Sequence, residues 1–184
     1  MDKKSRELIS HKIKNLSEIE ALIKKRPRNK KVIMCHGTFD VVHPGHIRHL
    51  LFAKSKADIL IVSLTADKHI KKANFRPFVP EDLRAINLAS LEFVDFVLID
   101  KNETPINNIK IIQPDFFAKG YEYSSNLMGK KTNEEIETIY NYGGEMIFTP
   151  GDIVYSSSAI IEEEMPNIRT EKLLNLMDAE GISF

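Results

Sequence analysis

Residues 36–49, HGTFDVVHPGHIRH, combine residue types that bind phosphate groups. Two of the four histidines, His43 and His46, are three residues apart with a proline and a glycine between them, a pattern typical of the first turn of a helix. That spacing places both imidazoles on the same side of the turn. Gly37 follows an apolar run, where a glycine lets the backbone approach a ligand closely, and a helix start offers N–H groups to an anion. The stretch therefore predicts a phosphate-binding turn between a strand and a helix.

Other known phosphate and metal motifs fit this stretch less well. It lacks the lysine of a P-loop and the G-x-G-x-x-G of a dinucleotide-binding fold. Four histidines suggest zinc, but the spacing contains no cysteine pair and the nearby acids do not complete a tetrahedral set. We interpret the flanking His36 and His49 as structural or surface histidines. The prediction therefore depends on His43 and His46.

Short apolar runs that alternate with helical patterns must position this turn. We expect strands at residues 31–37, 58–65, 94–100, 115–120 and 145–149. We expect helices at residues 44–57, 80–92, 104–112, 133–143 and 156–164. Strands separated by helices of about ten residues indicate an α/β, Rossmann-like fold, an open parallel sheet of about five strands with helices on both faces. Ligands bind such sheets beyond the carboxyl ends of the strands, where the strand order switches, and the histidine turn lies at such an end.

Residues 1–30 are predicted to form a helical, basic N-terminal extension. Apolar residues recur at helical spacing from about residue 5 to 25, and Ser17 with Glu20 forms a capping-box pattern at which the helix can restart. The basic run KKRPRNKK, residues 24–31, is interpreted as a solvated, poorly ordered lead-in to the first strand.

Composition narrows the class of protein. The 184 residues contain 26 Lys and Arg against 26 Asp and Glu, and a net charge of zero removes the argument for bulk nucleic-acid binding. The single cysteine, Cys35, provides no disulfide framework, and no apolar run approaches the roughly 20 residues of a membrane span. We expect a cytoplasmic protein that binds neither nucleic acid nor membrane. Its main domain is predicted at 31–164, followed at 165–184 by a helix or a linker to a possible further domain.

The histidine turn resembles the signature of the cytidylyltransferase-like nucleotidyltransferases. Their G-x-F-D-x-x-H-x-G-H motif is matched at Gly37, Phe39, Asp40, His43, Gly45 and His46. Residues 156–158 resemble the serine and threonine triplet of the family. Residues 76–95 resemble its RP-x5-R helix, with Arg84 in the arginine position. Residues 116–123 resemble its V-K-G-x-E/D-Y strand end. The resemblance covers about residues 31–164. It is closest to ADP-heptose-synthase-like domains, particularly those fused to a ribokinase-type sugar kinase.

The resemblance implies an HxGH-type nucleotidyltransferase. It would transfer a nucleoside monophosphate from an NTP to a sugar or polyol phosphate such as heptose 1-phosphate, and release pyrophosphate. ATP is favoured over CTP, although Tyr121 and the lack of an arginine before the serine triplet depart from the family pattern and leave the base open. The resemblance also implies Mg²⁺ carried by the NTP, a homodimer, and a sugar kinase fused to the chain or working with it.

Two alternatives share these motifs. One is a glycerol-3-phosphate-type cytidylyltransferase, and the other is a non-catalytic nucleotide-binding module. Class I aminoacyl-tRNA synthetases also contain H-x-G-H, but this chain has no K-M-S-K-S sequence.

The resemblance assigns catalytic roles to four residues and none to a metal ligand. His43 and His46 would donate N–H groups to the α-phosphate. Lys72 and Arg84 would reach the β- and γ-phosphates or the phosphate of the acceptor.

The remaining candidate residues would bind the nucleotide. Ser156 and Ser157 would hold the leaving pyrophosphate, and Asp40 would brace the loop or help to place Mg²⁺ through water. The full nucleotide-binding set is Gly37, Thr38, Phe39, Asp40, Gly45, Lys119, Gly120, Ser156 and Ser157.

Overall fold

A computed structural model describes residues 3–70, 76–120 and 130–149. Its α-helices are α1 (Lys3–Ser10), α2 (Leu16–Ile23), α3 (Pro44–Lys54), α4 (Glu81–Ala89), α5 (Ile106–Ile112) and α6 (Lys130–Tyr140), with a 3₁₀ turn η1 (Asp67–His69). Its strands are β1 (Val32–Gly37), β2 (Ile59–Thr65), β3 (Phe96–Asp100), β4 (Phe116–Lys119) and β5 (Glu145–Phe148). In these three ranges, no helix is long and apolar enough to cross a membrane. The helix expected at 156–164 falls outside the described residues.

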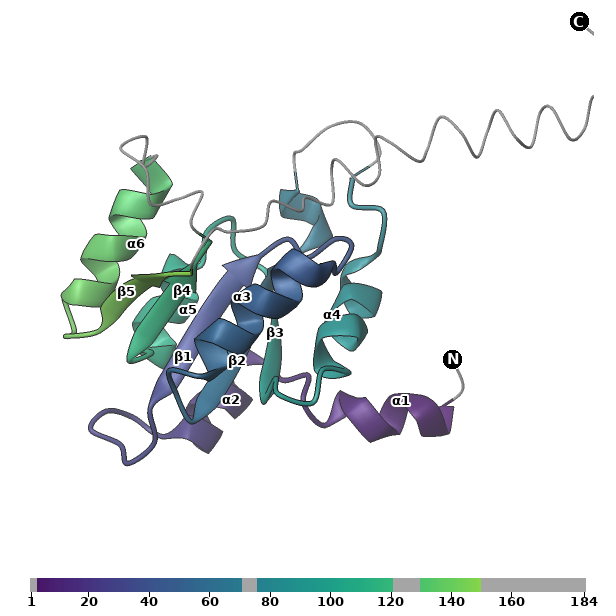
Figure 1. The fold of residues 1–184 in the computed structure, drawn as a ribbon, viewed down its shortest axis with the longest axis horizontal. Helices are drawn as coiled ribbons and strands as arrows, with labels where there is room; N and C mark the ends of the chain where they lie inside the picture. Colours follow the sequence, from purple (N-terminus) through teal and green to yellow (C-terminus); the bar gives the residue numbers. More distant parts are fainter. Residues whose placement is uncertain (1–2, 71–75, 121–129, 150–184) are drawn as a thin grey trace, which may run out of the picture.

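The five strands form one parallel sheet in the order β3-β2-β1-β4-β5, which confirms the predicted fold class (Figure 1). The chain builds the sheet outward from β1 to β3 and then returns to the other side of β1 with β4. The strand order therefore switches between β1 and β4, where Cys35 is paired with Ala118. This switch is the expected ligand site of an open α/β sheet.

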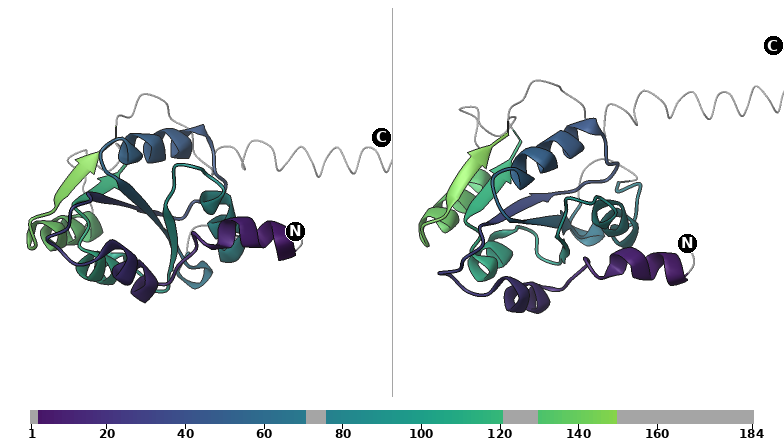
Figure 2. Two further views of the ribbon diagram at one scale, coloured as in Figure 1. Left: turned by 90° about the horizontal axis from the view of Figure 1, so that it is seen from below. Right: turned by 60° about the horizontal axis from the view of Figure 1, so that its bottom comes forward.

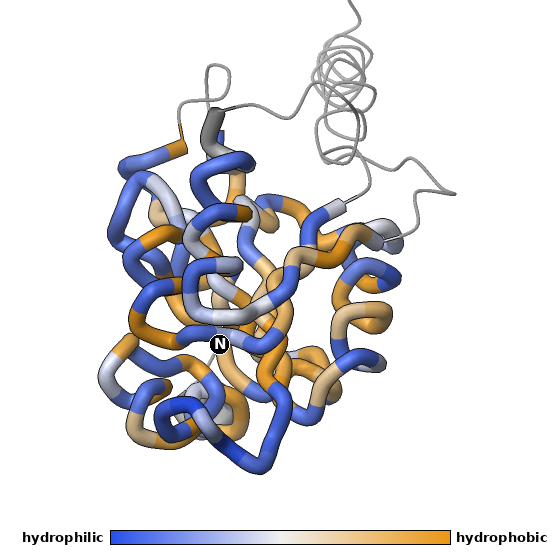
Figure 3. Tube along the Cα trace, turned by 90° about the vertical axis from the view of Figure 1, so that its left-hand side faces the viewer, coloured by the Kyte–Doolittle hydropathy of each residue, from blue (hydrophilic) through white to orange (hydrophobic). Residues whose placement is uncertain are grey.

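Helices cover both faces of the sheet (Figure 2). Alternate residues of β1 point to opposite faces, so Ile33 packs in a cluster with α3 and α4, while Met34 packs in a second cluster with α2, α5 and α6. Hydrophilic and hydrophobic residues alternate along the helical turns in Figure 3, as expected for helices that bury one side. The histidine turn begins where β1 leaves this two-sided core.

The N-terminal extension consists of two helices separated by residues 11–15. Asn15 caps α2: its Oδ1 accepts the Glu18 N–H at 3.0 Å, and the Glu18 carboxylate accepts the Asn15 N–H at 2.8 Å. The capping box expected at Ser17 and Glu20 is therefore wrong by two residues. Asparagine is as good an N-cap as serine, so both start points were compatible with the local sequence.

The extension is part of the core. Ile13 forms a parallel bridge with Val97 on the outer edge of β3. Ile19 and Ile23 of α2 are 0% and 5% exposed and pack against the sheet. Apolar burial of this kind contributes about 1.5–3 kcal/mol for each large side chain. The segment that follows α2 then runs back to the start of β1.

Two arginines of the basic run at 24–31 are packed, so its interpretation as a solvated lead-in is wrong for Arg26 and Arg28, while the other six residues are exposed. The Arg28 side chain is 4% exposed, and its guanidinium donates to the carbonyls of Ile112 and Gln113 and to the Asp115 carboxylate. Arg26 donates to the backbone carbonyl of Tyr142. These bonds attach the extension to the α5–β4 and α6–β5 connections.

We expect Arg28→Met to lower the free energy of unfolding by about 2–4 kcal/mol, because it leaves buried carbonyls and one carboxylate with fewer donors. Urea denaturation monitored by circular dichroism measures the change. Lys25→Met is the matched control: the Lys25 side chain is 83% exposed, and its ion pair with Glu20 spans 3.6 Å. That control should shift stability by no more than about 0.5 kcal/mol. Equal effects of the two substitutions would contradict a structural role for Arg28.

Candidate active site

The predicted turn lies between β1, which ends at Gly37, and α3, which begins at Pro44. His43 is the N-cap of α3, and its Nδ1 accepts the Gly45 N–H at 3.1 Å. His46 Nδ1 accepts the backbone N–H of His43 at 3.5 Å, which completes a reciprocal capping box. Two imidazoles thus perform the capping usually done by a hydroxyl and a carboxylate.

The two imidazoles lie together, as the spacing predicts. The ring centroids of His43 and His46 are 3.9 Å apart with planes at 29°, and the Phe39 ring packs 5.1 Å from that of His46. Burial lowers the pKa of His46 to about 4, with smaller contributions from His43 and His49, and burial also lowers the pKa of His43. Both rings are therefore neutral at pH 7.

The capping bond of His43 also decides which nitrogen of its ring carries the proton. A neutral imidazole has one donor and one acceptor nitrogen. Because Nδ1 of His43 accepts the Gly45 N–H, the proton of that ring is assigned to Nε2. The His46 ring has a further backbone partner, Val41, beside its 3.5 Å contact with the His43 N–H. The turn consequently places two adjacent, uncharged imidazoles at the start of a helix, a suitable arrangement for binding an oxyanion.

The loop before the histidines has a constrained backbone. Phe39 has a left-handed backbone at φ 50° and is 4% exposed. A Cβ at Gly37 would lie 3.2 Å from the Phe39 ring, so a larger residue there would have to displace this ring by a few tenths of an ångström. A bulky residue at positive φ is uncommon and costs about 1–3 kcal/mol, and it persists only where its surroundings hold it.

Asp40 braces the loop. Its Oδ1 accepts the Val79 N–H at 2.9 Å, and its Oδ2 pairs with Arg76 at 2.8 Å. Burial alone would raise the pKa of Asp40, but the bonds from Val79 and Arg76 outweigh it and lower the pKa below its ordinary value. The carboxylate is ionised at neutral pH, and both of its oxygens are engaged. This geometry favours the bracing role over a role in placing Mg²⁺.

Arg84 lies beneath the same loop and is 0% exposed. Its guanidinium donates to three backbone carbonyls and one carboxylate. The acceptors are Val79 O, Thr38 O, Thr65 O and Asp67 Oδ1. Arg84 thus joins the histidine loop to the end of β2 and to the start of its own helix. This network supports a positioning role for Arg84, while the prediction that it contacts a phosphate stays untested.

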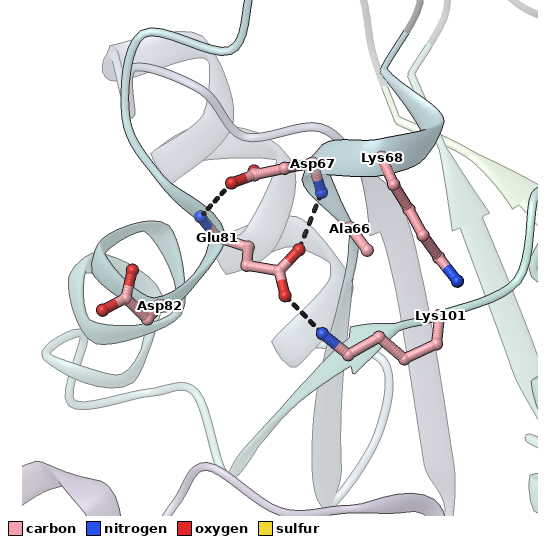
Figure 4. A pocket seen from close by; sticks show the side chains of 6 residues that line it. All are labelled: Ala66, Asp67, Lys68, Glu81, Asp82 and Lys101. Atoms are coloured by element: carbon pink, nitrogen blue, oxygen red, sulfur yellow. Dashed lines mark hydrogen bonds and ion pairs between the residues drawn. The ribbon is translucent and has the colours of Figure 1, made fainter.

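A clasp between η1 and α4 holds Asp67 (Figure 4). The Oδ1 atom of Asp67 accepts the bond from Arg84. The Asp67 N–H donates to Glu81 Oε2 at 2.7 Å, and the Glu81 N–H donates to Asp67 Oδ2 at 3.2 Å. Lys101 pairs with the other oxygen of Glu81. Together with Ala66, Lys68 and Asp82, these residues line a cleft beyond the ends of β2 and β3. Sequence reasoning missed the clasp, although acidic residues in the first turn of α4 were a visible sign of a helix start.

Comparison with known proteins identifies the family. The family model described as Cytidylyltransferase-like matches residues 34–163, most of the chain. The chain belongs to this family. Its histidine turn is thus an example of the cytidylyltransferase-like signature, and the family is one of nucleotidyltransferases.

Curated relatives are similar over the same region. The bifunctional protein HldE of Campylobacter jejuni (strain RM1221) is 40% identical over 131 residues, which cover 70% of this chain and 28% of the relative. The bifunctional protein HldE of Aliarcobacter butzleri (strain RM4018) is 40% identical over 131 residues, covering 69% and 28%. The chain thus spans little more than a quarter of the length of the curated relatives it matches.

Solved structures support the fold alone. The lipopolysaccharide core biosynthesis protein from Thermoplasma volcanium GSS1 superposes with a TM-score of 0.58 at 21% identity, covering 68% of this chain and all of that one. Pantoate-beta-alanine ligase from Francisella tularensis superposes with a TM-score of 0.54 at 16% identity, covering 79% and 68%.

The structure describes only some of the other candidate residues of the cytidylyltransferase-like site. Lys119 is the last residue of β4 and is followed directly by Gly120, so both lie at the β1–β4 switch. Lys72, Ser156 and Ser157 fall outside the described residues, and their roles stay predictions.

The two flanking histidines of this cytidylyltransferase-like chain are structural, as interpreted from the sequence. His36 bonds to the hydroxyls of Ser63 at 3.0 Å and Thr65 at 3.3 Å, and His49 bonds to Thr149 at 3.1 Å. Burial lowers the pKa of both imidazoles to about 4. Across the part of the chain that the structure describes, no three His, Cys, Asp or Glu residues are grouped to hold a metal ion.

Proposed function

We propose that this chain transfers a nucleoside monophosphate from an NTP, with ATP favoured over CTP, to a sugar or polyol phosphate resembling heptose 1-phosphate. One observation carries the proposal: His43 and His46 are stacked and neutral, at a helix start beyond β1. That arrangement suits an α-phosphate, and the family assignment supplies the reaction class.

The reaction requires positioned donors more than a strong base. The phosphate of the acceptor is largely a dianion near neutral pH, since its second pKa is about 6. One of its oxygens forms a bond to the α-phosphorus, the bond from that phosphorus to the β-bridging oxygen breaks, and pyrophosphate leaves with the electron pair. The imidazole N–H groups of His43 and His46 stabilise the charge that spreads over the α-phosphoryl oxygens.

The other residues are proposed to support this step. Lys72 contacts the β- and γ-phosphates or the acceptor, and Ser156 and Ser157 hold the leaving pyrophosphate. Arg84 positions the histidine loop, and Lys119 binds the nucleotide. Gly37, Thr38, Phe39, Gly45 and Gly120 complete the nucleotide-binding set. Mg²⁺ accompanies the triphosphate, because it keeps several waters and needs few protein ligands.

The setting of the reaction is also a proposal. We propose a cytoplasmic homodimer that works with a sugar kinase, fused or separate, because the chain corresponds to about a quarter of relatives named bifunctional. In this proposal the nucleotidyltransferase domain spans residues 31–164. The N-terminal extension spans residues 1–30, and a C-terminal helix or linker spans residues 165–184.

The proposed function is tested by measuring pyrophosphate release when the chain is supplied with each of several NTPs and sugar phosphates. We expect one NTP, with Mg²⁺, to raise the melting temperature, since a ligand at 100 times its Kd adds about 2.7 kcal/mol of stability. The same NTP should release pyrophosphate only when an acceptor such as heptose 1-phosphate or glycerol 3-phosphate is present. Stabilisation without pyrophosphate from any acceptor would favour the non-catalytic binding module. No stabilisation by any NTP would contradict the proposal.

A further inference from the structure

A nearly buried ion pair joins the end of β4 to α6. Lys119 Nζ pairs with the Glu135 carboxylate and donates to Thr132 Oγ1 at 3.2 Å. The Lys119 and Glu135 side chains are 12% and 6% exposed. Removing two charges from water is costly, and replacing such a pair with apolar residues is often neutral or stabilising. Fold stability alone therefore does not account for this pair.

The pair lies at the point where the strand order switches. Lys119 follows Ala118, which is paired with Cys35 of β1, so the lysine is next to the strand end that leads into the histidine loop. Burial, with a smaller contribution from the positive charge of Lys119, lowers the pKa of His36 in β1. Glu135 approaches from α6, which packs beside α5 on the same face of the sheet.

A carboxylate at this position opposes the binding of a polyanion. The Glu135 carboxylate pairs with the Lys119 ammonium. By charge alone, that ammonium would attract a nucleotide phosphate and the carboxylate would repel it. Interactions between unit charges near a protein surface are worth about 1–4 kcal/mol at a few ångströms. The balance between these two side chains is therefore large enough to set nucleotide affinity.

We propose that Glu135 is a positioning residue that competes with nucleotide phosphates for Lys119, and so weakens nucleotide binding and speeds nucleotide release. The inference rests on the proposed function, because it takes a nucleotide as the ligand of the switch. Thr132 accepts from the ammonium on the same helix, so α6 supplies two partners of Lys119.

Glu135→Gln tests the inference, since glutamine keeps the shape and the acceptor oxygen but removes the charge. We expect the Kd for Mg·ATP, measured by isothermal titration calorimetry, to fall by about threefold to thirtyfold. KM for the NTP should fall with it, while kcat should stay constant or decrease because release slows. Glu137→Gln makes the same charge change at an exposed position of α6 and should leave Kd unchanged.

A second pair of variants keeps the test decisive. Lys119→Met should weaken Mg·ATP binding, and adding Glu135→Gln to it should produce little further gain, because the competition no longer exists. Glu135→Asp should restore nucleotide affinity toward that of the unmodified chain. If Glu135→Gln folds poorly, the Lys119→Met variant provides the test. An unchanged Kd for Mg·ATP in Lys119→Met overturns the inference.

The outcomes separate this inference from the proposed function. Unchanged or weaker Mg·ATP binding in a folded Glu135→Gln variant overturns the inference, even if the chain releases pyrophosphate normally. Tighter Mg·ATP binding in that variant supports it, even if no acceptor supports pyrophosphate release and the proposed function fails.

Discussion

His46→Ala is expected to reduce turnover by about 10²- to 10³-fold, the usual cost of losing one well-aimed donor to a transition-state oxyanion. The substitution removes the imidazole donor and one long capping bond of 3.5 Å to the His43 N–H. Because that bond is weak, the fold should survive. Pyrophosphate release measures turnover, and circular dichroism with thermal melting measures folding.

The capping role of His43 allows a sharper form of this experiment. In His43→Asn, the asparagine oxygen can still accept the Gly45 N–H, but nothing replaces the Nε2–H donor. We therefore expect His43→Asn to melt close to the unmodified chain and to lose about as much turnover as His43→Ala, which also loses the cap. His11→Asn, at an exposed position, is the control and should change neither property. Undiminished turnover in His43→Asn would exclude His43 as a donor in the reaction.

The sequence was most informative where the relevant contacts are local. The strand positions followed from alternation of apolar runs, and the His43–His46 stack followed from a spacing of three residues at a helix start. Even here the capping bonds were not foreseen, because histidine is not among the preferred N-cap residues. The protonation of His43 on Nε2, which matters for the chemistry, depends on its capping bond to Gly45.

Long side chains with distant partners could not be predicted. Arg28 reads as one charge in a basic run, but its carboxylate partner Asp115 is 87 residues away. The guanidinium of Arg84 bonds to Thr38, which is 46 residues away, and no periodic pattern encodes such a contact. Composition and periodicity describe local structure, so charged residues with buried, non-local partners are read as solvated or as ligand contacts.

Arg84→Met is expected to lower the free energy of unfolding by about 3–5 kcal/mol, the usual cost of breaking a buried charged network by removing one partner. Arg84 is 0% exposed, and its loss leaves the Thr38, Thr65 and Val79 carbonyls without this donor. Urea denaturation measures the change. Leu83→Met, at an exposed neighbouring position of α4, should stay within about 0.5 kcal/mol of the unmodified chain.

The same variant distinguishes positioning of the loop from contact with a phosphate. If Arg84 positions the loop, Arg84→Lys should also lose stability and turnover, because an ammonium cannot reproduce the planar fork that reaches separate acceptors. Asp67→Asn should then lower turnover as well, since Asp67 binds the same guanidinium from η1. If Arg84 instead acts on a phosphate, Arg84→Lys should fold normally and only the NTP KM should rise. If both arginine variants unfold at the same urea concentration as the unmodified chain but bind NTP more weakly, the result would support a direct contact between Arg84 and a phosphate.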